Sequence, residues 1–350
     1  MTLNDRINAF SRLGELFSFY INNNNNYQII ESKPYALKLY NIIHSLKHKN
    51  GWFTEFQVNH SIAQWAKAFE KNTIQSWIKN YNVKDTSSLT VGIVMAGNIP
   101  LVGMHDLLCI LITGNKALIK TSSNDKDLVK FVAEFLIDHY DYFKNKIEFT
   151  DSKLENFDAV IATGSNNTAR YFEYYFKSKP SIIRKNRNSV AVLTGNETKQ
   201  QLKLLGEDIF RYYGLGCRSV SKIFVPKNYN FDDFFNAIYD FNHLIKETKY
   251  TNNYDYNKAV YLMSEFKILD NGFLILKEDQ SYSSPIGSLF YEFYDSKAAL
   301  INKFEKDKEL LQCVVNLAEN ENHVSFGQTQ QPSLNDYADN VDTLSFLLKI

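Results

Sequence analysis

The hydrophobic pattern of the chain changes at about residue 89. Up to about residue 80, apolar side chains recur at spacings of three and four, as in Phe10, Leu13 and Phe17, which predicts helices. From Leu89 onward, short apolar runs alternate with helix-like stretches. The pattern therefore predicts a helical N-terminal segment followed by α/β structure.

Strand and helix signals alternate most regularly between residues 90 and 176. The predicted strands are residues 90–95, 117–120 and 157–162, and the predicted helices are residues 101–112, 127–139 and 168–176. The short connections between them predict a parallel, doubly wound sheet. Ligands of such sheets bind beyond the carboxyl ends of the strands, so the loops there are the first candidates for a site.

A second α/β region follows. After a strand at residues 190–194, we predict a helix over 199–213, a strand over 221–225, a helix over 232–245, a Tyr- and Asn-rich loop at 252–256 and a terminal strand at 344–350. The expected fold is two doubly wound, Rossmann-type α/β domains with a helical N-terminal segment and a terminal strand. The expected domains are residues 1–195 and 196–325, with a tail, 326–350, that returns to the first domain or forms an oligomer interface.

Composition narrows the class of protein. The 350 residues are 44% hydrophobic and 22% charged, as in a globular protein of two domains. Lys and Arg together number 39, as do Asp and Glu, so the chain lacks the net positive field expected of a nucleic-acid-binding protein. No apolar run approaches the ~20 residues of a membrane-spanning helix and no signal peptide is evident, so we expect a cytoplasmic protein.

Of the three cysteines, Cys217 is the candidate nucleophile. It follows Gly214-Leu215-Gly216, between a predicted helix and a predicted strand, where two glycines let other groups approach the backbone closely. A thiol on such a turn is accessible to a substrate, although cysteine in general is most often a buried, small apolar residue. Cys109 and Cys313 stand in apolar runs and are predicted core residues. The spacing of the three fits neither a disulfide framework nor a metal site, so no metal is expected.

Several loops carry short motifs in a fixed order. These are Gly97-Asn98-Ile99-Pro100, Gly114-Asn115 with Lys120-Thr121, Thr163-Gly164-Ser165, Cys217 and Phe326-Gly327-Gln328. Together they resemble the motifs of the aldehyde dehydrogenase superfamily over roughly residues 85 to 335. The short length and the tail are most similar to the fatty acyl-CoA reductases of the bacterial luminescence (LuxC-like) type. The resemblance implies a nicotinamide cofactor-binding domain within residues 1–195 and a catalytic cysteine domain within residues 196–325.

Cys217 and Asn98 are the predicted catalytic residues. Attack of a thiolate on a carbonyl group places negative charge on the carbonyl oxygen. The side-chain NH2 of Asn98 and the backbone N–H of Cys217 could both donate hydrogen bonds to that oxygen. The alternative for Asn98 is a turn residue that precedes proline.

Lys120, Thr121, Gly164 and Ser165 are the predicted cofactor-binding residues. Lys120 stands at a strand end and could pair with ribose hydroxyls or a 2′-phosphate, or else lie in solvent. Gly164 and Ser165 precede a helix, whose first N–H groups favour a phosphate, while Ser165 could equally be an ordinary N-cap. No acidic residue that would repel a 2′-phosphate occurs in the segment 121–123, so NADPH is preferred, with NADH as the alternative.

Two glutamates of the family pattern are missing. The first, which activates water in hydrolytic members, would fall in residues 183–190, where no carboxylate occurs and Arg184 lies near its position. We expect Arg184, Lys185 and Arg187 to face solvent or the phosphates of coenzyme A. The second, which holds the nicotinamide ribose, would fall in residues 283–289, where serine or proline stands instead. Without a water-activating base, a thioester on Cys217 would favour exchange with a thiol.

The expected function is reduction of an acyl-CoA, with a fatty acyl chain, to the aldehyde through an S-acyl intermediate on Cys217. Two alternatives stay open: reduction of an acyl phosphate or a carrier-protein thioester, and a catalytically silent subunit for binding or assembly. The expected partners are acyl-CoA, further copies of the chain in a homo-oligomer and an enzyme that supplies the acyl group. His105 is a predicted core residue, and the sequence assigns no role to His323.

Overall fold

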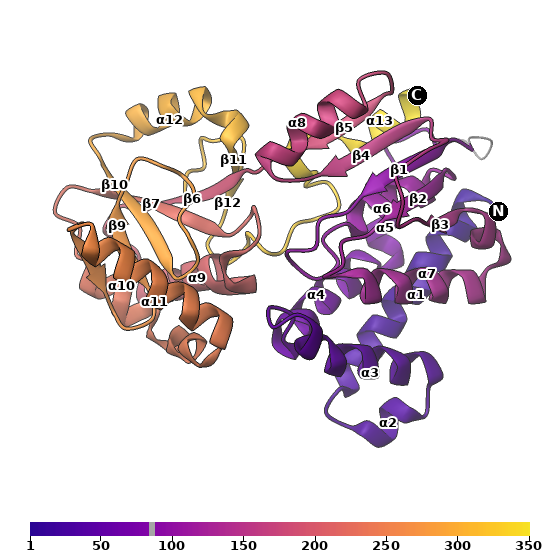
Figure 1. The fold of residues 1–350 in the computed structure, drawn as a ribbon, viewed down its shortest axis with the longest axis horizontal. Helices are drawn as coiled ribbons and strands as arrows, with labels where there is room; N and C mark the ends of the chain where they lie inside the picture. Colours follow the sequence, from indigo (N-terminus) through magenta and orange to yellow (C-terminus); the bar gives the residue numbers. More distant parts are fainter. Residues whose placement is uncertain (84–87) are drawn as a thin grey trace. The chain divides into compact units, whose positions relative to one another are not determined.

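The computed structural model describes residues 1–83 and 88–350 (Figure 1). The chain divides into two compact units, which we describe separately: unit 1 is residues 1–185 with 333–350, and unit 2 is residues 186–332. The division falls between Lys185 and Asn186, whereas the sequence pattern placed it at residue 195. It falls there because the strand expected to end the first domain, β6 (Asn188–Val192), pairs with strands of unit 2.

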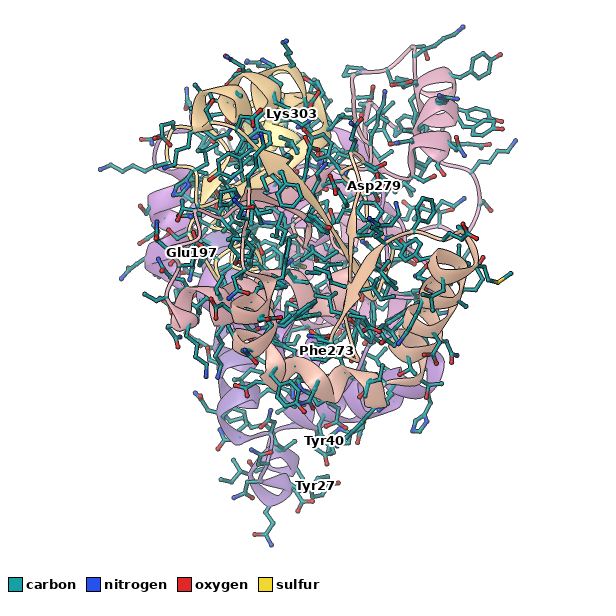
Figure 2. All side chains as sticks on the ribbon, turned by 90° about the vertical axis from the view of Figure 1, so that its left-hand side faces the viewer. Tyr27, Tyr40, Glu197, Phe273, Asp279 and Lys303 are labelled. Carbon is teal, nitrogen blue, oxygen red and sulfur yellow. The ribbon has the colours of Figure 1, made fainter. Side chains whose placement is uncertain are left out.

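The first part of unit 1 is helical, as predicted. Its helices are α1 (Leu3–Asn23), α2 (Tyr27–Glu31), α3 (Pro34–Lys49), α4 (Glu55–Ala68) and α5 (Lys71–Ile78). Helix α1 begins with a capping box in which Thr2 and Asp5 each accept a hydrogen bond from the other's backbone N–H. At the tip of this segment, the ring of Tyr27 packs edge-on against that of Tyr40 (Figure 2).

A five-stranded parallel sheet, sheet A, forms the rest of unit 1. Its strands are β1 (Thr90–Val94), β2 (Lys116–Lys120), β3 (Ile147–Phe149), β4 (Ala159–Thr163) and β5 (Ser181–Arg184), in the order β3-β2-β1-β4-β5. Helices α6 (Met104–Ile112), α7 (Lys126–His139) and α8 (Asn166–Tyr175) connect them, with a short 3-10 turn, η1 (Asp141–Asn145), before β3. The predicted doubly wound parallel sheet is therefore confirmed.

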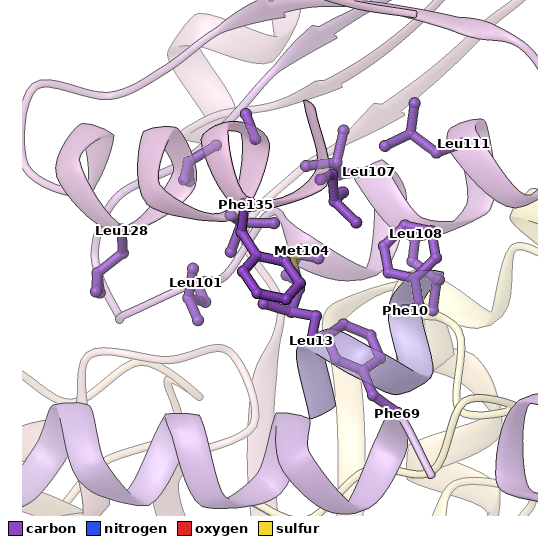
Figure 3. Packing of buried hydrophobic residues seen from close by; sticks show 14 of the residues in the cluster. Phe10, Leu13, Phe69, Leu101, Met104, Leu107, Leu108, Leu111, Leu128 and Phe135 are labelled. Carbon is purple, nitrogen blue, oxygen red and sulfur yellow. The ribbon is translucent and has the colours of Figure 1, made fainter. Parts of the chain in front are cut away.

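Helix α6 lies in the core of unit 1. Every residue of α6 except His105 is buried, and Figure 3 shows Leu107, Leu108 and Leu111 among aromatic side chains from α1 and from the end of α4. Burial on all sides explains why the later part of this helix, residues 107–112, is continuously apolar. The loop that precedes α6 therefore leads directly into a helix that is packed in the core.

Unit 2 is built on a seven-stranded sheet, sheet B. It contains β6, β7 (Val220–Pro226), β8 (Ile268–Asp270), β9 (Ile275–Glu278), β10 (Ser288–Tyr294), β11 (Leu311–Val315) and β12 (His323–Val324), in the order β12-β11-β6-β7-β10-β9-β8. All neighbours are parallel except β8 and β9. The helical elements are α9 (Lys199–Phe210), η2 (Arg211–Gly214), α10 (Phe231–Ala237), η3 (Tyr239–Lys246), α11 (Thr248–Met263), α12 (Lys297–Lys306) and η4 (Lys308–Leu310).

Two sequence-based assignments were wrong. The expected loop at 252–256 lies inside α11, where Tyr250, Tyr254 and Tyr261 form a buried helical stripe. The expected terminal strand is a helix, α13 (Thr343–Lys349). Asp342 caps that helix by accepting a hydrogen bond from the backbone N–H of Ser345 at 2.8 Å, and its apolar side chains are buried at helical spacing within unit 1.

Candidate functional site

The predicted residues of unit 1 gather at one edge of sheet A. Val94, the last residue of β1, pairs with Lys120 of β2 on one side and with Ala162 of β4 on the other. The loops that follow these three adjacent strands therefore start from the same carboxyl edge. Asn98 is on the first loop, Thr121 follows Lys120 at the end of β2, and Gly164 and Ser165 follow β4.

The loop between β1 and α6 has a close-packed backbone and an exposed tip. Asn98 is exposed, whereas Gly97 is buried directly against Ser122 of the next loop. A Cβ atom at position 97 would lie 2.3 Å from Ser122 Oγ, so only glycine fits there. Leu101 has φ of 56°, a left-handed conformation that is rare for a leucine. This loop thus presents the Asn98 side chain from a constrained backbone.

Polar groups also surround the predicted cofactor-binding residues. Lys120 is half-buried, and its Nζ donates to the backbone carbonyl of Ser152 at 2.9 Å. Gly164 donates its N–H to the carbonyl of Arg184 at 3.2 Å, which fixes the turn after β4. Ser165 is the N-cap of α8 and accepts from the backbone N–H of Thr168. Ser165 thus has the capping role that the sequence left open, and the start of α8 still faces the carboxyl edge of the sheet.

Cys217 belongs to unit 2 and lies on a turn between η2 and β7. Its side chain is exposed, whereas Cys109 and Cys313 are buried as predicted, and none of the three is in a disulfide. The turn closes through a hydrogen bond from Ser219 N–H to the carbonyl of Gly216 at 3.0 Å. Ser189 Oγ donates to the carbonyl of Cys217 at 2.9 Å, which ties the turn to β6. The backbone that carries this thiol is therefore held from two directions.

A buried carboxylate that the sequence reading missed organises the segment next to this turn. Asp208 of α9 is fully buried and accepts from the N–H of Gly327 at 2.7 Å and from the N–H and hydroxyl of Thr329 at 3.0 and 2.8 Å. The carbonyl of Thr329 in turn accepts from Arg218 Nε, beside Cys217. The available signal was an acidic residue on the apolar face of a helix, where Leu202, Leu205 and Ile209 are also buried.

This arrangement predicts a pH-dependent contribution to stability. Burial raises the pKa of Asp208 to about 6 from an ordinary 3.8, although the hydrogen bonds from Gly327 and Thr329 act in the opposite direction. Because the folded-state pKa is the higher one, this contribution is fully present below the unfolded-state value and is lost as the pH rises to about 6. A difference of about two pKa units corresponds to ~3 kcal/mol at most.

We expect the unfolding free energy of the wild type, minus that of Asp208→Asn, to fall as the pH rises from 3.8 to about 6 and to stay constant above that range. Denaturant titrations at a series of pH values measure this difference. Asp270→Asn is the control, because Asp270 also accepts a backbone N–H, from Gly272, but its pKa is lowered. Burial acts to raise the pKa of Asp270 and is outweighed by hydrogen bonds from Lys258, Gly272 and Tyr254, so its effect has the opposite sign. A pH-independent difference for Asp208→Asn would contradict the prediction.

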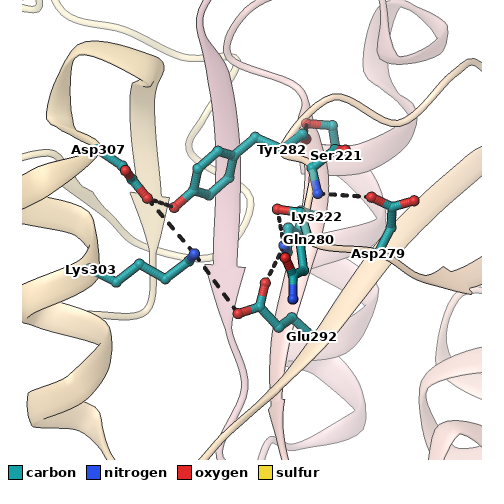
Figure 4. Close-up of polar contacts among 9 residues, drawn as sticks. Ser221, Lys222, Asp279, Gln280, Tyr282, Glu292, Lys303 and Asp307 are labelled. Carbon is teal, nitrogen blue, oxygen red and sulfur yellow. Dashed lines mark hydrogen bonds and ion pairs between the residues drawn. The ribbon is translucent and has the colours of Figure 1, made fainter.

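Strand β7, which follows the Cys217 turn, is anchored by a buried lysine. Lys222 is fully buried, and its ammonium group contacts Glu292 of β10 and the carbonyl of Gln280 (Figure 4). The ring of Tyr282 lies 5.3 Å from Lys222 Nζ, and the hydroxyl of that tyrosine donates to Asp307. Burial lowers the pKa of Lys222, and Glu292 opposes this effect. The network joins β7 to β10 inside sheet B, so the strand behind the turn is fixed by charge as well as by apolar packing.

Arg184 and His105 both prove to be structural residues, and the expectation that Arg184 faces solvent or coenzyme A was wrong. Arg184 is buried in an ion pair with Asp106 of α6 and donates to Thr343 Oγ1 of α13, so it faces neither solvent nor a ligand. The sequence did not predict these contacts of Arg184 because its partners come from distant parts of the chain. His105 is a packed residue, as predicted: Nε2 contacts the carbonyl of Leu334 at 3.0 Å, and burial lowers its pKa.

The other two basic residues of that segment have surface partners. Lys185 pairs with Glu173, and Arg187 contacts Glu309 and the carbonyls of Lys308 and Leu311. In residues 1–83 and 88–350, no cluster of His, Cys, Asp and Glu is arranged to hold a metal ion. Within the same ranges, no helix has both the length and the apolar character needed to cross a membrane.

The fold is similar to that of several solved aldehyde dehydrogenases. An aldehyde dehydrogenase from Bacillus cereus in complex with NAD+ superposes with a TM-score of 0.60 at 12% identity, covering 92% of this chain and 73% of that one. The substrate-bound state of Staphylococcus aureus AldH gives 0.56 at 16% identity, covering 92% and 77%. An NAD-dependent benzaldehyde dehydrogenase from Corynebacterium glutamicum gives 0.60 at 12% identity, covering 86% and 74%. The chain therefore has the aldehyde dehydrogenase fold.

The sequence itself is similar to one family of enzymes. Residues 70–241 match the family of acyl-CoA reductases (LuxC). This segment, just under half of the chain, includes the Asn98 loop, both cofactor-side loops and Cys217. The resemblance to LuxC-like members of the aldehyde dehydrogenase superfamily is confirmed. No curated protein gives a significant match to the sequence.

Proposed function

We propose that this protein is an NAD(P)H-dependent acyl-CoA reductase of the acylating aldehyde dehydrogenase type, which forms an S-acyl intermediate on Cys217. The observation that carries the proposal is an exposed thiol on a tied-down turn, within the segment similar to acyl-CoA reductases. The fold also supports the proposal, because aldehyde dehydrogenases interconvert aldehydes and carboxylic acids, and a thioester carbon has the oxidation state of a carboxylic acid carbon.

The first half of the proposed reaction is acyl transfer. The thiolate of Cys217 attacks the thioester carbonyl, and the bond between that carbon and the sulfur of coenzyme A then breaks, releasing the coenzyme A thiol. In this scheme, the Asn98 amide and the Cys217 backbone N–H donate to the oxyanion while it exists. The exposed position of Asn98, on a backbone with no freedom at Gly97, supports its role as a preorganised donor.

The second half is reduction, and the residues at the edge of sheet A fit a nicotinamide cofactor. The Lys120 ammonium and the hydroxyl of Thr121 would hold the adenosine ribose or its 2′-phosphate, and the turn of Gly164 and Ser165 with the start of α8 would face the pyrophosphate. When bound, reduced NADP supplies a hydride to the acyl carbon. The resulting tetrahedral alkoxide on Cys217 then collapses: its carbon–sulfur bond breaks, the aldehyde leaves, and the released Cys217 thiolate takes up one proton.

The direct test is consumption of NADPH or NADH by the purified protein in the presence of acyl-CoA thioesters of graded chain length. Parallel reactions with an acyl phosphate and with an acyl-carrier-protein thioester distinguish the alternative acyl donors. Aldehyde formation in step with cofactor oxidation supports the proposal. Failure with every donor and both cofactors rejects the enzyme hypothesis and favours a binding or assembly subunit.

A further prediction is that the acyl-enzyme persists in water. Residues 183–190 offer no carboxylate to activate water, and Arg184, which lies near the position of the missing glutamate, is bound to Asp106. Incubation with acyl-CoA but no cofactor should therefore give an adduct on Cys217 that intact-mass measurement detects for many turnover times. Added coenzyme A should remove the adduct by reversing the transfer. Rapid release of the free acid would contradict the prediction, and Cys217→Ser, which should form no adduct, is the control.

We further propose that the protein forms homo-oligomers and receives its acyl group from a partner enzyme. Both proposals follow from the family resemblance rather than from a surface of this chain. Light scattering measures the molar mass in solution and so tests for the homo-oligomer. The partner enzyme is tested by mixing the protein with a candidate activating enzyme that carries a labelled acyl group, and by following transfer of the label to Cys217.

A further inference from the structure

We propose that Asp125 is a positioning residue for Asn98: its buried carboxyl group holds the backbone after Asn98 and joins that loop to the cofactor-side loop after β2. The inference rests on the proposed function for its catalytic consequence. Its structural part concerns only unit 1 and can be tested without any activity.

Asp125 contacts the Asn98 loop at its most constrained point. One carboxyl oxygen, Oδ2, accepts a hydrogen bond from the backbone N–H of Leu101 at 2.7 Å. Asp125 is 2% exposed and Leu101 is 1% exposed, so water does not compete for this contact. Leu101 has φ of 56°, a conformation that persists only where surrounding contacts maintain it. The Asp125 carboxyl group is such a contact.

The same two loops touch at two further points. Gly97 lies directly against the side chain of Ser122, three residues before Asp125. At the base of the loops, the N–H of Met95 donates to the carbonyl of Lys120 at 3.0 Å. Asn98 therefore lies between two points, Gly97 and Leu101, that are both fixed to the segment 120–125. Groups that order this segment, including a cofactor at Lys120 and Thr121, would also order Asn98.

The chemical state of Asp125 gives a matched pair of variants. Its second oxygen, Oδ1, is buried and has no hydrogen-bond partner within residues 1–83 and 88–350. Burial raises the pKa of this carboxyl group well above its ordinary value, against the effect of the hydrogen bond from Leu101. An asparagine is close to this aspartate in shape and keeps one side-chain oxygen as a hydrogen-bond acceptor. Asp125→Asn keeps an oxygen for Leu101 N–H, while Asp125→Ala removes it.

The kinetic test is a double-mutant cycle with Asn98. We expect Asp125→Ala to lower kcat by about 10-fold or more, because a displaced oxyanion donor loses much of the ~10²–10³ that one donor supplies. Asp125→Asn should stay within about threefold of the wild type, and in an Asn98→Ala background Asp125→Ala should have little further effect. If the two losses instead multiply, or if Asp125→Asn is as impaired as Asp125→Ala, Asp125 does not act through Asn98.

The activity-independent test is hydrogen exchange of the backbone amides in residues 96–103. Asp125→Ala should raise exchange there by about 10-fold or more, and Asp125→Asn should not, since only the first loses the acceptor for Leu101 N–H. Asp127→Ala is the control, because Asp127 is two residues away on α7 and pairs with Lys49 on the surface. Unchanged exchange in Asp125→Ala, or a uniform rise throughout unit 1, overturns the inference. If the wild type reduces no acyl donor, the proposed function fails while this exchange test still decides the structural claim.

Discussion

Cys217→Ser is expected to lower the rate of acyl-CoA reduction by at least about 10³-fold, because a serine hydroxyl ionises far less readily than a thiol and nothing assigned to this site acts as its base. Steady-state oxidation of NADPH with saturating acyl-CoA measures the loss. The substitution changes one exposed atom on a turn whose backbone contacts are made by Ser189 and Ser219, so the fold should be preserved. Its unfolding free energy should stay within about 0.5 kcal/mol of the wild type.

Alkylation of the native protein provides the matching control. Cys109 and Cys313 are buried, so iodoacetamide should label Cys217 alone, and activity should fall in step with that single label. Prior incubation with acyl-CoA should protect the thiol. A Cys217→Ser enzyme that retains a rate within about tenfold of the wild type would show that the nucleophile lies elsewhere.

Asn98→Ala is expected to lower kcat by about 10²–10³-fold, the usual loss when one oxyanion donor is removed. The Michaelis constant for NADPH should change little, because the proposed cofactor-binding residues lie on the loops after β2 and β4. Steady-state kinetics with each substrate varied in turn separates the two constants. Because Asn98 is exposed, its truncation leaves no buried cavity.

Asn124→Ala is the matched control for Asn98→Ala. Asn124 is an exposed asparagine on the neighbouring loop after β2, and no catalytic role is proposed for it. Its replacement should leave kcat within about twofold of the wild type. Equal losses in the two variants, or a loss confined to cofactor binding in Asn98→Ala, would remove Asn98 from the oxyanion site.

Short-range patterns predicted much of the fold correctly. The three- and four-residue spacing of Phe10, Leu13 and Phe17 reflects one buried face of α1, so it predicted that helix directly. The apolar runs that became β1, β2 and β4 alternate with helix-like stretches, and this alternation correctly predicted a parallel sheet. The turn that carries Cys217 was predicted for the same kind of reason, from glycines between a helix and a strand.

The sequence failed where a segment is short or tyrosine-rich. Residues 344–350 are too few to distinguish the 3.6-residue period of a helix from the two-residue period of a strand. The segment is helical because Asp342 caps it and its apolar side chains are buried within unit 1. Residues 252–256 look like a loop by composition. They are helical because Tyr250 and Tyr254 are buried on one face of α11, and that packing overrides local preference.

Local periodicity and short motifs in order along the chain were enough to predict the fold class, the LuxC-like resemblance and the candidates for catalysis. Only the tertiary structure revealed the buried carboxyl groups that organise the candidate loops. Asp125 is 24 residues from Leu101, and Asp208 is 119 residues from Gly327, so no local pattern pairs them. Burying a polar group costs free energy unless the group has a hydrogen-bond partner. The role of such a residue therefore depends on the partner that the fold places beside it.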